Sequence, residues 1–179
     1  MTSIGEYALS SCKTLASIKI PAKVTSISTG ILFDCSNLID VEILGAVTSI
    51  GDSAFMSCRN LTDIKIPDTV TSIGKNAFYM SGLTSIKIPN TVTSIGENAF
   101  YECSSLAKIE MPANMPSISQ DAFYRTTTTV DETRVFYYPG YRHDWDQQVS
   151  KISVNGNTDL LVNDYERVHY YCDVIFNSN

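Results

Sequence analysis

The chain has 179 residues, of which 44% are hydrophobic and 18% charged, and its formal net charge at pH 7 is −6. That length suits one domain with its own apolar core, and the negative charge disfavours a binder of nucleic-acid backbone, which needs a basic surface. No apolar run approaches the roughly 18 residues of a membrane-spanning helix, and the first residues, "MTSIGEYALSSCK", lack the basic and apolar regions of a secretory signal.

A repeat of about 23 residues organises most of the chain. The decapeptide "VTSIGKNAFY" at 70–79 returns almost unchanged as "VTSIGENAFY" at 92–101. A fixed period of this length is typical of a solenoid, in which coils stack because no coil can bury its own apolar side. We expect five full coils and a partial sixth over residues 1–125. The spacings are 23, 23, 23, 22 and 23 residues between Ile4, Ile27, Ile50, Ile73, Ile95 and Ile118.

Each coil is predicted to contain two extended segments and a turn. In "LTDIKIP" (61–67) apolar and polar residues alternate, which indicates a strand with one buried and one solvated face. A proline ends this segment in most coils, as expected of a residue without an N–H donor. "VTSI" indicates a second, shorter extended segment. "DSAFMSC", "KNAFYMS" and "ENAFYEC" indicate a short helical or 3₁₀ turn.

Stacked coils should place equivalent side chains about 4.8 Å apart, so that they form ladders. One ladder is predicted to be a buried apolar spine: Leu9, Leu32, Phe55, Phe78, Phe100 and Phe123. The residues that follow the spine form either a second contact surface or half-buried packing between coils: Phe33, Met56, Tyr79, Tyr101 and Tyr124.

Four of the five cysteines occupy one ladder position, with Ser81 near the gap: Cys12, Cys35, Cys58 and Cys103. A metal site would need convergent ligands, often in closely spaced pairs, and the sequence has none. Disulfides between adjacent coils would need strict spacing of the Cα atoms and direction of the Cβ atoms. Buried free thiols that pack as small apolar groups are the favoured interpretation. Cys172 lies outside the ladder.

The solvated positions of the longer strands form two rows of polar side chains, which are the candidate partner-binding residues. The rows lack the aromatic anchors typical of a binding hot spot, and mixed charges also stabilise a sheet and keep it soluble. One row holds Ser17, Asp40, Asp63, Ser85 and Lys108, and the other holds Lys19, Glu42, Lys65, Lys87 and Glu110.

The repeat resembles the BspA-type leucine-rich repeats of bacterial and protist surface proteins. The motif that carries the resemblance is "IG-x-x-AF-x-x-C-x-x-L-x-x-I-x-IP-x-x-VTS", at 50–72 and 95–117, and the likeness covers about residues 1–125. It implies an α/β, β-rich, right-handed solenoid with a concave sheet, a cell-surface or secreted location, and adhesion to a partner. It transfers no catalytic residue. One coil differs from this motif, because it has Leu44-Gly45 where the motif has the strand-ending proline.

Residues 126–179 are predicted to form an α+β cap over the last coil. "TTTTV" at 126–130 breaks the repeat, and the segment holds eight acidic and four basic residues. "RVFYYPGYRHDWDQQV" (134–149) indicates a strand, a turn and an amphipathic helix. "KISVNGNTDLLV" (151–162) indicates a hairpin, and "RVHYYCDVIF" (167–176) indicates a half-buried strand.

No catalytic, cofactor or metal site is predicted. His143 and Asp146 would share a helical turn but lack a third ligand, and His169 and Cys172 would point to opposite faces of a strand. Asp144 is the remaining catalytic or metal-binding candidate among the residues of the cap. We therefore predict a non-enzymatic binding or adhesion module without a cofactor.

The predicted partner is a protein or glycan surface, and neither nucleic-acid binding nor membrane insertion is expected. A second copy of the chain could also pair with the uncapped first coil to form a homodimer. The alternative is a small intracellular, cytoplasmic binder or inhibitor, perhaps from a mobile element, that acts through its acidic surface.

Overall fold

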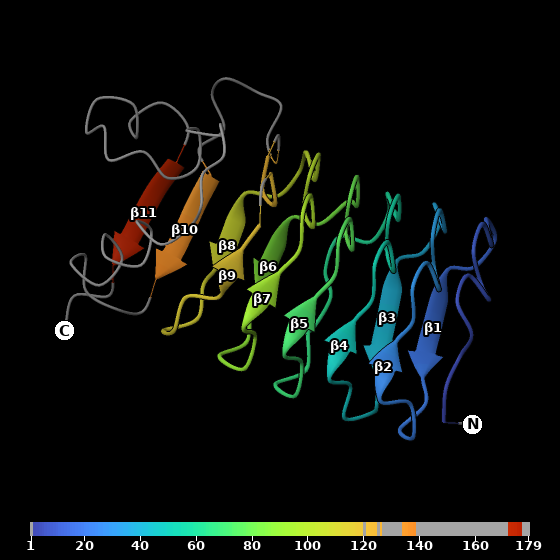
Figure 1. Cartoon of the computed structure of the whole chain (residues 1–179). Coiled ribbons are helices and arrows are strands. Elements are labelled where there is room, and N and C mark those ends of the chain that lie inside the picture. The colour runs from blue at the N-terminus through green and yellow to red at the C-terminus, as the bar shows by residue number, and fades with distance from the viewer. Residues whose placement is uncertain (1, 120, 125, 127–133, 139–171, 177–179) are drawn as a thin grey trace.

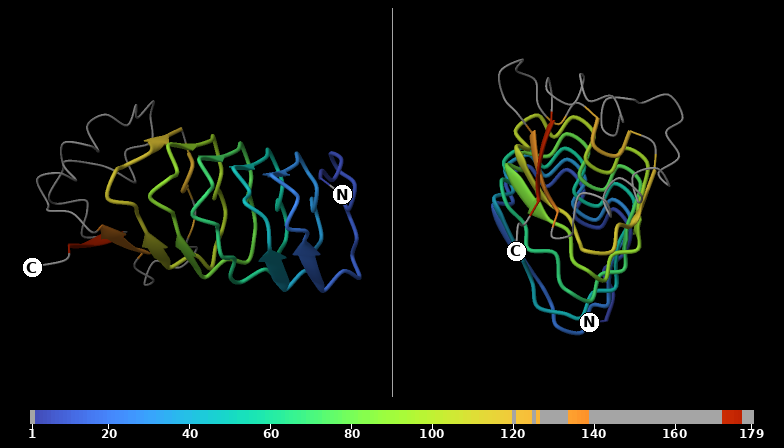
Figure 2. Two further views of the ribbon diagram at one scale, coloured as in Figure 1. Left: turned by 90° about the horizontal axis from the view of Figure 1, so that it is seen from below. Right: turned by 90° about the vertical axis from the view of Figure 1, so that its left-hand side faces the viewer.

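The computed structural model describes residues 2–119, 121–124, 126, 134–138 and 172–176, the last two ranges by their backbone. Two rows of short strands run along the molecule from its N-terminal end, and one of them ends at β11 (Cys172–Phe176) (Figure 1). Viewed along this direction, successive coils superimpose on a common outline (Figure 2). All the strand pairs of the described part are parallel, and the predicted solenoid is confirmed.

The shorter extended segments form one continuous five-stranded sheet. Each consists of one serine and one isoleucine, and isoleucine pairs with isoleucine in successive coils, as in Ile27↔Ile50 and Ile50↔Ile73. Their apolar side chains face the core, so the prediction from "VTSI" is confirmed. The strands are β2 (Ser26–Ile27), β4 (Ser49–Ile50), β5 (Ser72–Ile73), β7 (Ser94–Ile95) and β9 (Ser117–Ile118).

The longer strands form two separate sheets. Within the part of the chain that the structure describes, β1 (Ser17–Ile20) pairs only with β3 (Asp40–Ile43). The second sheet has the order β11-β10-β8-β6. Its other members are β6 (Ser85–Lys87), β8 (Lys108–Glu110) and β10 (Arg134–Tyr138).

The strand predicted at 61–67 is wrong, although this coil carries the fullest copy of the motif. No strand is assigned there, and residues 63–66 make no backbone hydrogen bond within the described part of the chain. The following coil is one residue shorter at its corner, where Gly82 N–H donates to the Cys58 carbonyl at 3.1 Å. We attribute the missing pairing with β6 to this tightened corner, because it distinguishes this pair of coils from the others. The missing pairing with β3 on the other side has no explanation in the structure.

The predicted helical turn is also wrong, since the described residues contain no helix. The amides of "DSAFMSC" alternate between two kinds of partner. Ala54 N–H donates within its own coil to Gly51, whereas Ser53 N–H donates to Lys75 of the next coil at 2.8 Å. Ser53 and Ser57 have φ angles of 54° and 60°, in the left-handed region, and such residues interrupt a right-handed helix.

The apolar spine packs as predicted. The rings of Phe55, Phe78, Phe100 and Phe123 stack in sequence with centroid separations of 5.2, 5.1 and 4.9 Å and interplanar angles of 9° or less. Leu32 is fully buried and Leu9 is half-buried. Coil stacking therefore converts a repeated phenylalanine into a continuous core.

Several expectations fall on parts of the chain that are not described. β10 confirms the strand predicted to open 134–149, and it continues the sheet of β8 in parallel. The expected helix, the hairpin and the side chains of His143, Asp144, Asp146 and His169 lie outside the described residues. The right-handed winding, the concave shape and the α+β cap stay predictions. A search of the described residues finds no helix that is long and apolar enough to cross a membrane.

Candidate binding surface

The ten polar residues chosen from the sequence share one side of the solenoid, which we call the long-strand face. β1 and β3 bring Ser17 opposite Asp40 and Lys19 opposite Glu42. β6 and β8 likewise bring Ser85 opposite Lys108 and Lys87 opposite Glu110. Asp63 and Lys65 belong to the unpaired coil between these sheets. Ser85 and Glu110 are half-buried, and the other eight residues are exposed.

Ion pairs neutralise the two ends of the long-strand face. Lys19 Nζ lies 2.7 Å from Glu42 Oε2, and Lys108 Nζ lies 2.6 Å from Glu110 Oε1. The hydrogen bond to Glu42, with that carboxylate's charge, raises the pKa of Lys19. Lys65 and Lys87, in neighbouring coils at the middle, have no acidic partner within 4.0 Å among the described residues. Asp40 and Asp63, which are also exposed, lie within 4.0 Å of no basic group of the described residues, so the middle of the face presents unpaired charges of both signs.

Two exposed apolar side chains flank β3. Ile39 is 59% exposed and Leu44 is 52% exposed, and they precede and follow the strand. The sequence held a signal for both. Leu44 replaces a proline, and Ile39 stands where the other coils have Ala16, Thr62, Thr84 and Ala107. Neither residue was predicted as part of the site, because both lie just outside the alternating strand positions on which that prediction rests.

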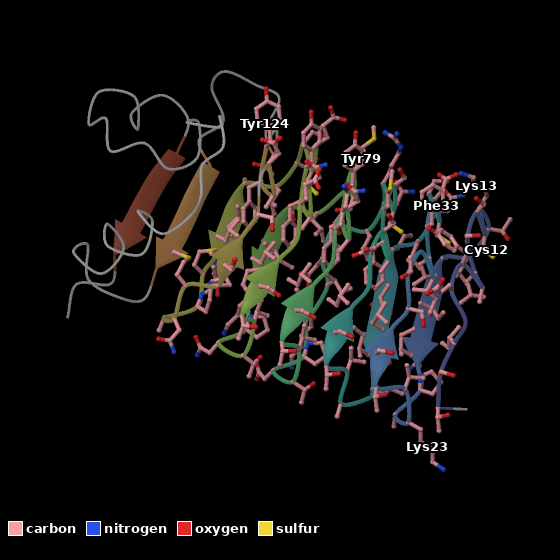
Figure 3. All side chains as sticks on the ribbon, in the orientation of Figure 1. Cys12, Lys13, Lys23, Phe33, Tyr79 and Tyr124 are labelled. Atoms are coloured by element: carbon pink, nitrogen blue, oxygen red, sulfur yellow. The ribbon has the colours of Figure 1, made fainter. Side chains whose placement is uncertain are left out.

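The second candidate contact surface, formed by the residues that follow the spine, consists largely of aromatic rings that stack on one another. Figure 3 shows Phe33, Tyr79 and Tyr124 along one edge of the molecule. The Tyr79 and Tyr101 rings stack at 5.2 Å and 7°, and Tyr101 and Tyr124 meet at 5.3 Å and 39°. All are half-buried. Because the rings cover one another's faces, this ladder fits packing between coils better than a platform for a ligand.

The four ladder cysteines are free thiols, as predicted. Cys35, Cys58 and Cys103 are buried, and each thiol donates to a carbonyl oxygen of an earlier coil. Burial raises the pKa of Cys35, and it raises the pKa of Cys58 and of Cys103 to about 12. Thiols held in the neutral form are poor nucleophiles and poor metal ligands. No group of three metal-ligating side chains occurs in the described part of the chain.

Comparisons with known proteins agree with this architecture. The family model of the "BspA type Leucine rich repeat region" matches six copies over residues 1–83 and 29–133. A leucine-rich repeat protein from Bacteroides ovatus is 29% identical with a TM-score of 0.64; the match covers 76% of this chain and 37% of that one.

The leucine-rich repeat protein of T. pallidum shares the fold, with a TM-score of 0.67, 22% identity, and coverage of 87% of this chain and 78% of that one. A search of curated proteins gave no match. The chain belongs to the BspA-type leucine-rich repeat family.

Proposed function

We propose that this chain is a non-enzymatic binding module that holds a protein partner against its long-strand face. Leucine-rich repeats of this type are general protein-interaction modules. The observation that carries the proposal is the pair Lys65 and Lys87, exposed in neighbouring coils and unpaired with any acid of the described residues. A partner with acidic groups opposite these lysines and a basic group opposite the equally unpaired Asp63 would neutralise them, whereas the lysines at the two ends already have partners.

The shape of this side supports a macromolecular partner. Its strands run parallel, about 4.8 Å apart within each of two sheets, with the unpaired coil between them. We infer an open surface, whereas sites for small molecules are concave and enclose most of the ligand. Ile39 and Leu44 add exposed apolar area beside β3. Apolar anchors surrounded by polar groups are typical of protein interfaces, so we favour a protein over a glycan.

Family membership supports a role at the cell surface or outside the cell, with adhesion as the biological outcome. Contacts through exposed lysines weaken with salt. Binding by one module of this kind is therefore expected to be weak, and additional repeats or copies would strengthen it through avidity.

Protein and glycan arrays probed with the purified chain at low and physiological salt test this proposal. The double variant Lys65→Glu/Lys87→Glu should lose at least about tenfold in affinity for the proteins bound, the effect of roughly 1.4 kcal/mol. The matched control is Lys23→Glu/Arg59→Glu, which makes the same charge change at exposed positions outside the two rows. Figure 3 places Lys23 at the edge opposite Tyr79.

The two variants separate the long-strand face from general electrostatics. Loss with the first variant and retention with the control support the proposal. Equal losses show that only net charge matters. Full retention by the first variant contradicts the long-strand face as the site. Melting curves of both variants should match the parent within about 0.5 kcal/mol, since surface substitutions of this kind cost little.

A further inference from the structure

The two rows of the long-strand face continue beyond the repeat, onto β10. This strand pairs in parallel with β8, and the register places Val135 opposite Lys108 and Tyr137 opposite Glu110. Lys108 and Glu110 are the last members of the two rows chosen from the sequence. Because residues in register occupy the same side of a sheet, Val135 and Tyr137 hold the next position of each row.

β11 extends the rows by one more strand. Its register with β10 places Asp173 opposite Val135 and Ile175 opposite Tyr137. The residues between these positions are in register with Ile109 of β8, which is fully buried in the core, so the alternation of core and row positions is kept. Figure 1 shows β10 and β11 following β8 at the C-terminal end of the molecule.

The residues that occupy the rows change in kind at this end. Up to β8 every row position holds serine or a charged residue, whereas three of the four positions on β10 and β11 hold Val135, Tyr137 and Ile175. Tyrosine and other large apolar side chains supply most of the binding energy at protein interfaces. The two strands outside the repeat thus bring to the long-strand face the kind of anchor that the repeat itself lacks.

The row that contains Lys87 has an ordered sequence of chemistry. Lys65 and Lys87 have no acid within 4.0 Å among the described residues, and the next member, Glu110, is neutralised by Lys108 at 2.6 Å. Tyr137 and Ile175 of the following strands, β10 and β11, complete the row. A ligand lying along this row would therefore meet positive charge at one end and apolar residues at the other.

The spacing of the row indicates which element of a partner fits it. With strands about 4.8 Å apart, Tyr137 lies about 9.6 Å and Ile175 about 14.4 Å from Lys87 along the row. An α-helix advances about 10.5 Å in seven residues and about 15 Å in ten, and residues at these intervals share one face. An extended segment repeats on one face only about every 6.7 Å, which misses the interval to Tyr137.

We propose that the long-strand face binds an amphipathic helix of the partner protein, laid along the row with an acidic end over Lys65 and Lys87 and an apolar end over β10 and β11. This inference rests on the proposed function, because it names the part of the protein partner that the face would take. The neutral pair of Lys108 and Glu110 would lie beneath the middle of the helix. A basic residue on the flank of the helix would match Asp63 of the other row.

Synthetic helical peptides and the full chain test this proposal. The designed peptide carries two glutamates four residues apart and leucines seven and ten residues after the second glutamate, in an alanine- and glutamine-rich background. A second peptide carries the same pattern in the reverse direction. The control peptides have the same composition, with both leucines moved by two residues to the opposite side of the helix. Fluorescence anisotropy at low salt measures the affinities.

One of the two designed peptides should bind at least about tenfold more tightly than its control. The variant Tyr137→Thr/Ile175→Thr should abolish this difference, while threonine keeps the preference for a strand. Lys65→Glu/Lys87→Glu should instead weaken the designed and control peptides to a similar extent. Melting curves establish that both variants are folded.

The unmodified protein gives a second measurement. A photoreactive benzophenone in place of either leucine should cross-link to 134–138 or 172–176, as mapped by mass spectrometry. Equal affinity of designed and control peptides, or cross-links confined to residues before 108, would overturn the proposal. If array proteins still lose affinity in Lys65→Glu/Lys87→Glu, the proposed function stands and only the helix and its apolar anchors are wrong. If they do not, the long-strand face itself is wrong.

Discussion

The Cys103 Sγ lies 2.9 Å from the carbonyl oxygen of Phe78 in the previous coil and 3.2 Å from the Oγ of Ser81. Burial is the main reason that the pKa of Cys103 rises to about 12, from 9.0 for a free thiol, and Cys58 shows the same rise. Ser81 occupies the ladder position between these two cysteines. This ladder position therefore holds a small, neutral side chain that can form a hydrogen bond with a neighbouring coil.

Alkaline pH should destabilise the fold through these thiols. Between pH 9 and 12 the unfolded chain releases a proton that the folded thiol keeps, so stability falls as pH rises, by up to about 1.4 kcal/mol per pH unit for each thiol. Urea melts at pH 7 to 10.5 measure the slope. Cys103→Ser is the matched variant, because serine already occupies position 81. An unchanged slope in this variant would contradict the assignment.

The ladder thiols should react in an order set by burial. In the folded protein, iodoacetamide should modify Cys12, which is half-buried, well before Cys35, Cys58 and Cys103. Urea should make all four react at similar rates. Peptide mapping by mass spectrometry checks this order. Fast modification of Cys58 without denaturant would show that the core opens locally.

The aromatic spine should dominate stability. Phe78 lies between Phe55 and Phe100 and is fully buried, so Phe78→Ala should cost about 3–5 kcal/mol. Lys87→Ala, on the exposed side of the same coil, should stay within about 0.5 kcal/mol. Urea melts measure the free energy of unfolding of the two variants. Similar losses would show that the spine is not the main contributor to the stability of the core.

The repeat allowed the stacked features to be predicted, because a ladder needs only that equivalent residues recur. The spine, the buried thiols, the "VTSI" strands and the rows of Lys19 and Glu42 follow from spacing alone. Features that depend on differences between coils were missed. Nothing in "LTDIKIP" itself indicates that its strand fails to pair, since the nearly identical "LTSIKIP" at 83–89 contains the paired strand β6.

Local conformation was harder to predict than stacking. Ser57, Met80 and Glu102 adopt φ angles of 60°, 56° and 54°, a region that favours glycine and asparagine. Bonds to the next coil, such as Met80 N–H to the Tyr101 carbonyl at 2.9 Å, hold this conformation. Because those bonds exist only after stacking, the segment itself resembles a helical turn.

The shortened corner should tolerate no side chain at Gly82. A Cβ atom there would lie 2.0 Å from the Arg59 carbonyl oxygen, which is backbone and cannot rotate away. Gly82→Ala should therefore destabilise the protein by at least about 1–3 kcal/mol through overpacking. Gly5→Ala is the matched control, since a Cβ at Gly5 meets nothing within 4 Å. Thermal melts that rank the two variants equally would contradict this contact.

The interruption of the long-strand face should be visible in amide exchange at two equivalent residues. Ile66 and Ile88 are 4% and 2% exposed, so the burial of their side chains is matched. Ile88 N–H donates to the Glu110 carbonyl at 2.9 Å, whereas Ile66 makes no backbone hydrogen bond within the described part of the chain.

Exchange at Ile66 should then be at least about tenfold faster than at Ile88, because exchange follows the opening of hydrogen bonds rather than side-chain burial. Equal protection would show that the two sheets join in solution. Because Lys65 precedes Ile66, the same measurement with a bound partner reports on the long-strand face. Slower exchange at Ile66 than in the free protein would mean that binding orders the unpaired coil, and unchanged exchange would mean that the face is already in its binding conformation.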